Sequence, residues 1–142
     1  MIVVDASVVV KWYLPEAGQP AALQLMRGAE DLVAPHLIRQ EVAGAFVRRF
    51  RDGELPVDDA HAAYAVWEQD LSEGLVRLIP DIELYDEAVE FAFKAKHTIP
   101  DCLYVVIGKR HDAAIITADR RLVERGKSVY ERIMLLEGSN PN

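Results

Sequence analysis

The stretch Ile2-Val3-Val4-Asp5-Ala6-Ser7 decides the fold class, because a short run of branched aliphatic residues ends there on an acid. An apolar run without polar alternation is typical of a strand that is buried on both faces of a parallel sheet. Similar short runs follow at 32–34, 75–79, 114–117 and 129–136. Helical patterns separate them, at 21–27, 36–51, 57–73, 83–95, 100–111 and 120–125. The alternation predicts an α/β fold with a mainly parallel central sheet flanked by helices.

The length of the chain favours a single domain. The 142 residues are enough for one hydrophobic core, and no linker, internal repeat or low-complexity segment divides them. We expect the domain to span residues 1–137 and residues 138–142 to form a flexible C-terminal tail.

Four widely spaced acids lie where such a fold could bring them together. Asp5 and Asp119 each follow an apolar run, and parallel strands end at the same edge of a sheet. Two further acids are expected on helices, Asp101 next to Pro100 at a helix start and Glu41 one turn into the helix after Pro35. Carboxylates crowded into one pocket repel one another, so such a cluster calls for a bound cation, Mg²⁺ or alternatively Mn²⁺. The pattern therefore predicts a metal-dependent phosphodiesterase.

Simpler interpretations of two of these acids stay open. Asp101 can be an ordinary acid in the first turn of a helix, where the helix dipole favours negative charge. Glu41 can be a solvated residue on a helix surface. If Glu41 points inward, Arg48 or Arg49 lies on the same face of the helix at helical spacing. These two arginines are then candidates for binding the phosphate groups of RNA beside the metal.

The charge balance and the scarcity of cysteine narrow the function classes. The formal net charge of −7 argues against a nucleic-acid partner, unless several acids are metal ligands and the clumped arginines face the substrate. A single cysteine, Cys102, excludes an internal disulfide and a cysteine-rich zinc site, which suits a reducing cytoplasm. No apolar run is long enough to span a membrane, and the four histidines are too scattered to suggest an acid–base pair.

The chain resembles the PIN domains, and more narrowly the VapC-type ribonuclease toxins of toxin–antitoxin pairs. The resemblance covers nearly the whole chain and rests on four segments in order: residues 2–7, 37–42 (Leu-Ile-Arg-Gln-Glu-Val), 100–104 (Pro-Asp-Cys-Leu-Tyr) and 115–122 (Ile-Ile-Thr-Ala-Asp-Arg-Arg-Leu). Cys102 departs from the small residue expected at its position.

The resemblance implies both a site and partners. Asp5, Glu41, Asp101 and Asp119 match the acidic metal-binding and catalytic residues of the family, and Ser7 and Thr117 match supporting hydroxyl positions. The implied activity is hydrolysis of RNA phosphodiesters by metal-activated water, leaving 5′-phosphate and 3′-hydroxyl ends. The implied partners are an RNA substrate, a cognate VapB-like antitoxin and a second copy of the chain in a homodimer. For Ser7 alone, the sequence also allows a role as the N-cap of a helix over residues 8–14.

Three alternatives to a nuclease are compatible with some of these features. A haloacid-dehalogenase-like phosphatase needs a second acid two residues after Asp5, where the chain has Ser7. A receiver domain needs adjacent acids after its first strand, and the chain has one. The third is a catalytically weak PIN-like module that only binds RNA or protein. For a protein partner, an apolar groove over residues 12–14, Tyr64 and Trp67 is one interpretation, and packing of these residues in the core is the other.

Overall fold

The computed structural model describes residues 1–139 and contains a five-stranded sheet in which every pair of neighbouring strands is parallel. The strand order is β3-β2-β1-β4-β5. The strands are β1 (Ile2–Val4), β2 (Leu32–Pro35), β3 (Arg77–Ile79), β4 (Ala114–Thr117) and β5 (Ile133–Leu135). The predicted α/β fold with a parallel central sheet is therefore confirmed.

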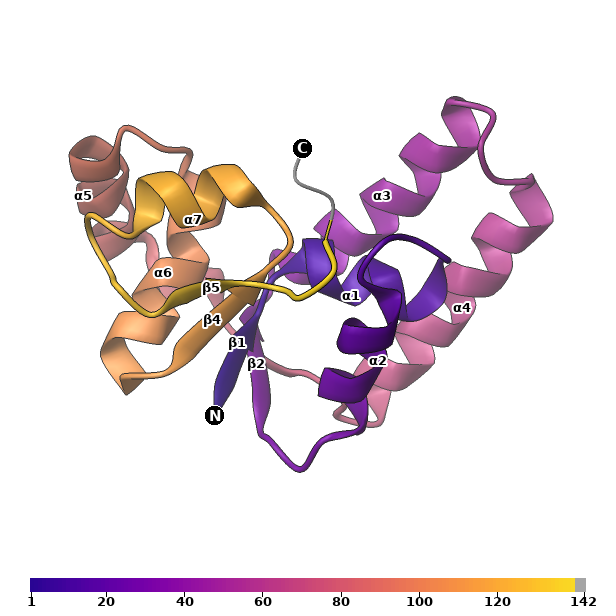
Figure 1. The fold of residues 1–142 in the computed structure, drawn as a ribbon, viewed down its shortest axis with the longest axis horizontal. Coiled ribbons are helices and arrows are strands. Elements are labelled where there is room, and N and C mark those ends of the chain that lie inside the picture. The colour runs from indigo at the N-terminus through magenta and orange to yellow at the C-terminus, as the bar shows by residue number, and fades with distance from the viewer. Residues whose placement is uncertain (140–142) are drawn as a thin grey trace.

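Helices cover both sides of the sheet (Figure 1). One group, at the left of the view, consists of α5 (Tyr85–Ala95), α6 (Ile99–His111) and α7 (Arg120–Gly126). The other group consists of α1 (Ala6–Tyr13), α2 (Gln19–Arg27), α3 (Ile38–Arg51) and α4 (Val57–Ser72). A short 3₁₀ turn, η1 (Asp81–Glu83), precedes α5. No helix within residues 1–139 is both long enough and apolar enough to cross a membrane.

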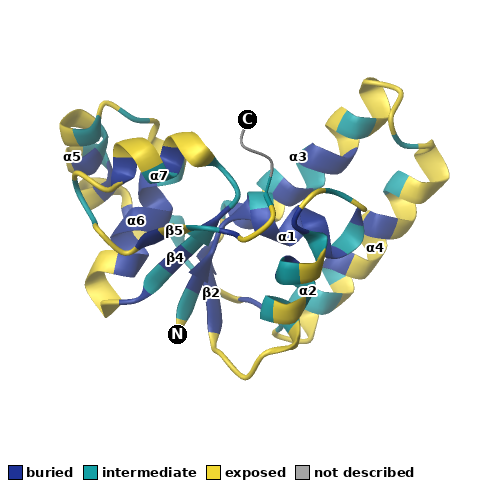
Figure 2. Ribbon diagram, viewed as in Figure 1, coloured by how far each residue is buried: buried dark blue, intermediate teal, exposed yellow. Residues whose placement is uncertain are grey.

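The core lies where the sheet meets α1 and α6. In α6 every residue from Cys102 to Gly108 is buried, and this helix packs against β1, β2 and β4 (Figure 2). The aromatic residues considered above for a partner groove mostly belong to the core, since Trp67 is fully buried and Trp12 and Leu14 are nearly so. Of this set, Tyr64 is exposed.

Strands β3 and β5 begin later than predicted, because the first residues of each apolar run form hydrogen bonds at the end of the preceding helix. Leu75 donates its amide hydrogen to the carbonyl of Asp70, so it completes the end of α4 rather than beginning β3. Val129 and Tyr130 both donate to the carbonyl of Gly126 and in the same way complete α7. An apolar run alone does not reveal which of its residues are used to end the preceding helix.

The predicted tail, 138–142, falls partly outside the described residues. Residues 140–142 lie beyond them. The two residues that are described pack on the turn before α2, where a Cβ built on Gly18 would lie 3.2 Å from the side-chain oxygen of Ser139. Gly18 has a φ of 87°, a conformation that glycine adopts without strain.

The close approach of α6 to β4 depends on Gly108. A Cβ at this position would lie 2.8 Å from both Cγ1 and Cδ1 of Ile115, which is fully buried. We expect Gly108→Ala to destabilise the fold by about 1 kcal/mol or more, because overpacking outweighs the gain in helix propensity.

Gly44 provides a matched control for that substitution, since it also lies within a helix but a Cβ there would meet nothing within 4 Å. Gly44→Ala should therefore stabilise the fold by up to about 1 kcal/mol. Urea unfolding of both variants measures the difference. Equal effects of the two substitutions would show that packing at Ile115 is not what requires glycine at position 108.

Candidate metal-binding active site

The crevice of the sheet lies beyond the carboxyl ends of β1 and β4. Strand β1 pairs with β2 on one side and β4 on the other, so the connections leave in opposite directions from this point. Ligand sites of open α/β sheets form at such a switch point. A pocket of about 460 Å³ occurs here, and the residues that line it include Asp5, Ser7, Gln40, Glu41, Gly44, Arg48, Asp101 and Asp119. The four acids singled out from the sequence therefore line one pocket.

Asp5 is the most buried of the four acids, with 6% of its surface exposed. Its Oδ2 accepts hydrogen bonds from the hydroxyls of Ser7 at 2.5 Å and Thr117 at 2.8 Å. Each hydroxyl in turn accepts a backbone amide hydrogen, from Ala118 and Asp119 respectively, both at 2.9 Å. Each hydroxyl hydrogen is therefore directed at Asp5.

The helix that follows Asp5 begins earlier than the sequence suggested. Helix α1 starts at Ala6 with Asp5 at the N-cap position, so the alternative role of Ser7 as the cap of a helix over residues 8–14 is wrong. The hydroxyl of Ser7 instead connects the first turn of α1 to the loop after β4.

Burial raises the pKa of the Asp5 carboxyl, and the negative charges of Asp101 and Asp119 raise it further. The hydrogen bonds from the two hydroxyls act in the opposite direction, because they favour the ionised form. A carboxylate kept in this environment is stabilised by any cation that enters the pocket.

Glu41 lies in the first turn of α3 and is held by Tyr104 of α6, whose hydroxyl donates to Oε1 at 2.7 Å. Burial raises the pKa of Glu41 from its usual 4.5 to about 7, and the charges of Asp5 and Asp101 contribute to the increase. Tyr104 was not singled out from the sequence as a site residue. Its position one helical turn after Asp101 was the available signal.

Asp101 lies in the first turn of α6, where Thr98 is the N-cap residue. The hydroxyl of Thr98 donates to its Oδ2 at 3.3 Å, and Nδ1 of His97 lies 3.1 Å from the same oxygen. Burial raises the pKa of Asp101, and the negative charge of Asp119 adds to this effect. His97 is a second contact of the site that was not identified from the sequence. It lies in the segment between α5 and α6, next to the start of the helix that carries Asp101.

Asp119 is the N-cap residue of α7, and its Oδ1 accepts the amide hydrogen of Arg121 at 2.9 Å. Its own amide donates to the hydroxyl of Thr117, which also contacts Asp5. Hydrogen bonds at the end of β4 therefore hold Asp119 together with Thr117, the residue that donates to Asp5.

The chemistry of these side chains fits a hard divalent cation. All four acids offer oxygen ligands, and three of them have raised pKa values that a cation would reverse. Within residues 1–139 no three His, Cys, Asp or Glu side chains form a group that could hold an ion directly between them. Mg²⁺ keeps several water ligands and often uses only one or two carboxylates, so direct contact with three acids is not needed.

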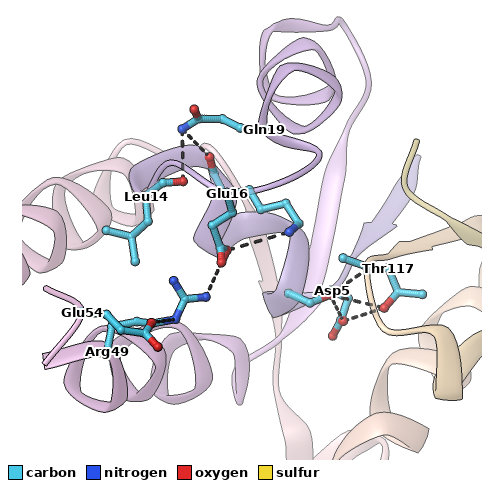
Figure 3. A network of polar contacts seen from close by, with 10 residues as sticks. Asp5, Leu14, Glu16, Gln19, Arg49, Glu54 and Thr117 are labelled. Atoms are coloured by element: carbon cyan, nitrogen blue, oxygen red, sulfur yellow. Dashed lines mark hydrogen bonds and ion pairs between the residues drawn. The ribbon is translucent and has the colours of Figure 1, made fainter. Parts of the chain in front are cut away.

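The two arginines considered for RNA binding differ in their surroundings. Arg48 lines the acidic pocket. Arg49 instead pairs with Glu16, in the segment before α2, and its Nε lies 3.5 Å from Glu54 (Figure 3). Lys11 of α1, which is buried, lies 3.9 Å from the same Glu16. Arg49 thus connects α3 to the segment between α1 and α2, and of the two arginines only Arg48 lines the acidic pocket.

Comparison with known proteins supports the relationships expected from the sequence. Residues 2–128 match the family model described as the PIN domain. The chain is 32% identical over 128 residues to a protein named ribonuclease VapC9 of Mycobacterium tuberculosis, covering 90% of this chain and 93% of that protein. It is 28% identical over 125 residues to ribonuclease VapC3 of Pyrobaculum aerophilum, covering 87% and 93% respectively.

Solved structures show the same fold. The structure of PAE2754 from Pyrobaculum aerophilum matches with a TM-score of 0.70 and 22% identity, over 96% of this chain and 89% of that one. That of VapC20 from Mycobacterium tuberculosis, described as a toxin that cleaves the sarcin–ricin loop, matches with a TM-score of 0.60 and 17% identity, over 83% and 88%.

Proposed function

We propose, because the chain belongs to the PIN domain family, that it is a Mg²⁺- or Mn²⁺-dependent endoribonuclease toxin of a type II toxin–antitoxin system. The observation that carries the proposal is the pocket at the switch point of the sheet, which Asp5, Glu41, Asp101 and Asp119 line together. The similarity to proteins named VapC ribonuclease supports RNA as the substrate.

In this proposal the four acids supply the negative charge that holds the metal, through its water ligands where they do not bind it directly, and prepare the site for the phosphodiester. When bound, the ion supplies Lewis-acid chemistry, since it activates water and neutralises the charge that builds up on the phosphate. The hydroxyls of Ser7 and Thr117 hold Asp5 in one orientation. The hydroxyl of Tyr104 donates to Oε1 of Glu41, and Oε2 is the oxygen proposed to face the metal.

A cleavage assay with control of the metal tests the proposal. Purified protein is incubated with a mixed RNA in EDTA and then with Mg²⁺ or Mn²⁺ in excess, and the new RNA ends are sequenced. We expect cleavage only with the metal, and products with 5′-phosphate and 3′-hydroxyl ends. Cleavage that persists in EDTA would refute the metal role. RNA binding without any cleavage would favour the alternative, a PIN-like binding module.

Arg48 should contribute to RNA binding and Arg49 to the fold. We expect Arg48→Ala to raise the KM for RNA about fivefold, because it removes a phosphate contact from the wall of the pocket. The effect should shrink at high salt. Arg49→Ala, one residue along the same helix, should leave the KM nearly unchanged and lower the urea midpoint instead, because Arg49 is paired within the protein. A higher KM for Arg49→Ala together with an unchanged KM for Arg48→Ala would contradict this prediction and identify Arg49 as the residue that contacts RNA.

The antitoxin partner fits an apolar groove between α3 and α4. This groove has a volume of about 390 Å³, and its lining includes Phe50, Val57 and Tyr64, each at least 40% exposed. An amphipathic helix suits such a groove. The groove shares Tyr64 with a polar pocket, which in turn shares Gln40 with the acidic pocket.

This continuity favours an antitoxin that binds the groove with a helix and extends toward the acids. We expect an Arg or Lys of the antitoxin to reach the acidic pocket, and a complex without a basic side chain near Asp5 or Asp101 would contradict this. The homodimer implied by the family resemblance stays a prediction, to be checked by analytical ultracentrifugation of the purified chain.

A further inference from the structure

A second polar pocket adjoins the acidic one and has no role in the chemistry described so far. Its volume is about 440 Å³, and Gln40 lines both pockets. It lies between the start of α3, the exposed side of α4 and η1, and the side chains that matter are His36, Arg39, Gln40, Tyr64, Glu68 and Asp81. Helices α3 and α4 lie side by side along its length (Figure 1).

The charges of this pocket disfavour a phosphate group. Arg39 donates from Nε and Nη2 to the two carboxylate oxygens of Glu68, at 2.8 and 2.7 Å, so this edge of its guanidinium group is already occupied. Asp81 brings a further negative charge, and one of its oxygens, Oδ1, accepts the amide hydrogen of Leu37 at 3.1 Å. The other oxygen of Asp81 is suited to accept a hydrogen from an amino group.

The same residues offer flat surfaces to a planar ligand. Tyr64, which lines the pocket, is an exposed residue, with 40% of its surface accessible. The side chain of Arg39 is 60% exposed, and its two bonds to Glu68 hold the guanidinium plane in a fixed orientation. Unpaired RNA bases are recognised by stacking on aromatic rings and guanidinium planes and by hydrogen bonds to their edges.

We propose that this pocket binds an unpaired RNA base adjacent to the phosphate held in the acidic pocket. The base is one with an exocyclic amino group, which donates to Asp81, while its ring stacks on Tyr64. The proposal rests on the proposed ribonuclease function. It assigns the choice of cleavage sequence to a pocket that is separate from the four acids.

Binding of a fluorescent base tests the pocket without any cleavage. The probe is a single-stranded oligouridine with one central 2-aminopurine, which loses fluorescence when it stacks, and the protein is the Asp101→Asn variant in Mg²⁺. We expect clear quenching with Asp101→Asn alone and with the double variant that also carries Tyr64→Phe, which keeps the aromatic ring. The double variant that carries Tyr64→Ala should bind the probe about tenfold more weakly. Tyr85→Ala removes an equally exposed tyrosine from α5 and should change nothing.

Cleavage kinetics provide the second arm. With a site mapped in the assay above, an abasic nucleotide next to the cut should raise the KM about tenfold for the wild-type protein. The increase should be clearly smaller for Tyr64→Ala, in which the base keeps only its contact with Asp81. Quenching that does not depend on the ring of Tyr64, or an abasic effect that is as large in Tyr64→Ala as in the wild-type protein, would overturn the proposal. A Tyr64→Ala variant that loses antitoxin binding but still binds and cleaves RNA like the wild-type protein would also overturn the proposal.

The two arms keep this proposal separable from the proposed function. A wild-type protein that never cleaves RNA refutes the ribonuclease function, whereas quenching that depends on Tyr64 would still establish the base pocket. Normal cleavage without that quenching refutes the base pocket alone.

Discussion

Replacing Asp101 with Asn is expected to lower the rate of RNA cleavage at least about a hundredfold, because a metal-held carboxylate contributes several kcal/mol to stabilisation of the transition state. The substitution keeps the size of the side chain and can keep its hydrogen bond from Thr98. It removes a negative charge from a pocket in which burial and neighbouring acids already raise the pKa of Asp101. The fold should therefore persist, and Mn²⁺ binding should weaken in parallel with the rate.

Asp86→Asn is the matched control, since Asp86 also lies in the first turn of a helix, α5, but is exposed and outside the pocket. We expect it to cleave RNA at the wild-type rate. Steady-state kinetics on one RNA substrate and isothermal titration with Mn²⁺ measure both variants. An Asp101→Asn protein with full activity would remove Asp101 from the catalytic site and leave it as an ordinary helix acid.

The metal-free protein is expected to lose stability as the pH rises. Glu41 has a pKa of about 7 in the fold against a usual 4.5, so the folded chain binds its proton more tightly than the unfolded chain does. The resulting stabilisation is fully present below the unfolded value and is lost as the pH rises through about 7. Glu41 alone accounts for about 3 kcal/mol. The raised pKa values of Asp5 and Asp101 act with the same sign.

Urea unfolding in EDTA at about pH 5.5 and about pH 8 measures the part of this effect that falls between the two pH values, about 2 kcal/mol for Glu41, as a difference in unfolding free energy. Glu41→Gln should flatten the dependence, because glutamine has no proton to release. Saturating Mg²⁺ should restore stability at the higher pH, where it binds the ionised acids. A metal-free protein that is more stable at the higher pH would contradict the electrostatics described for this pocket.

The sequence was most informative where one residue pattern determines both a strand and the site at its end. The run before Asp5 predicts a buried strand, and the direction of that strand alone places the acid at the edge where parallel sheets bind ligands. The same holds for Thr117 and Asp119 after β4. For these residues local structure is sufficient, so their positions could be expected without knowledge of the packing.

Contacts between helices were less predictable. Tyr104 of α6 donates to Glu41 of α3 although the two helices belong to groups on opposite sides of the sheet, and no pattern within either helix shows that contact. Arg48 and Arg49 are neighbours in sequence, yet a rotation of about 100° per residue points them to different surroundings. A charge pattern could not separate them, because the partner of Arg49 is Glu16, in a loop more than thirty residues earlier.

Both hydroxyl hydrogens that reach Asp5 go to Oδ2, and among the described residues no side-chain hydrogen bond goes to Oδ1. A carboxylate held in this way offers a cation one ligand atom rather than a chelating pair. Mg²⁺ accepts single oxygens in a compact octahedral shell, whereas Ca²⁺ surrounds itself with six to eight oxygens and often takes two from one carboxylate. If the proposed metal binds here, its selection of Mg²⁺ over Ca²⁺ would depend in part on the hydroxyls of Ser7 and Thr117, which hold Oδ2 of Asp5.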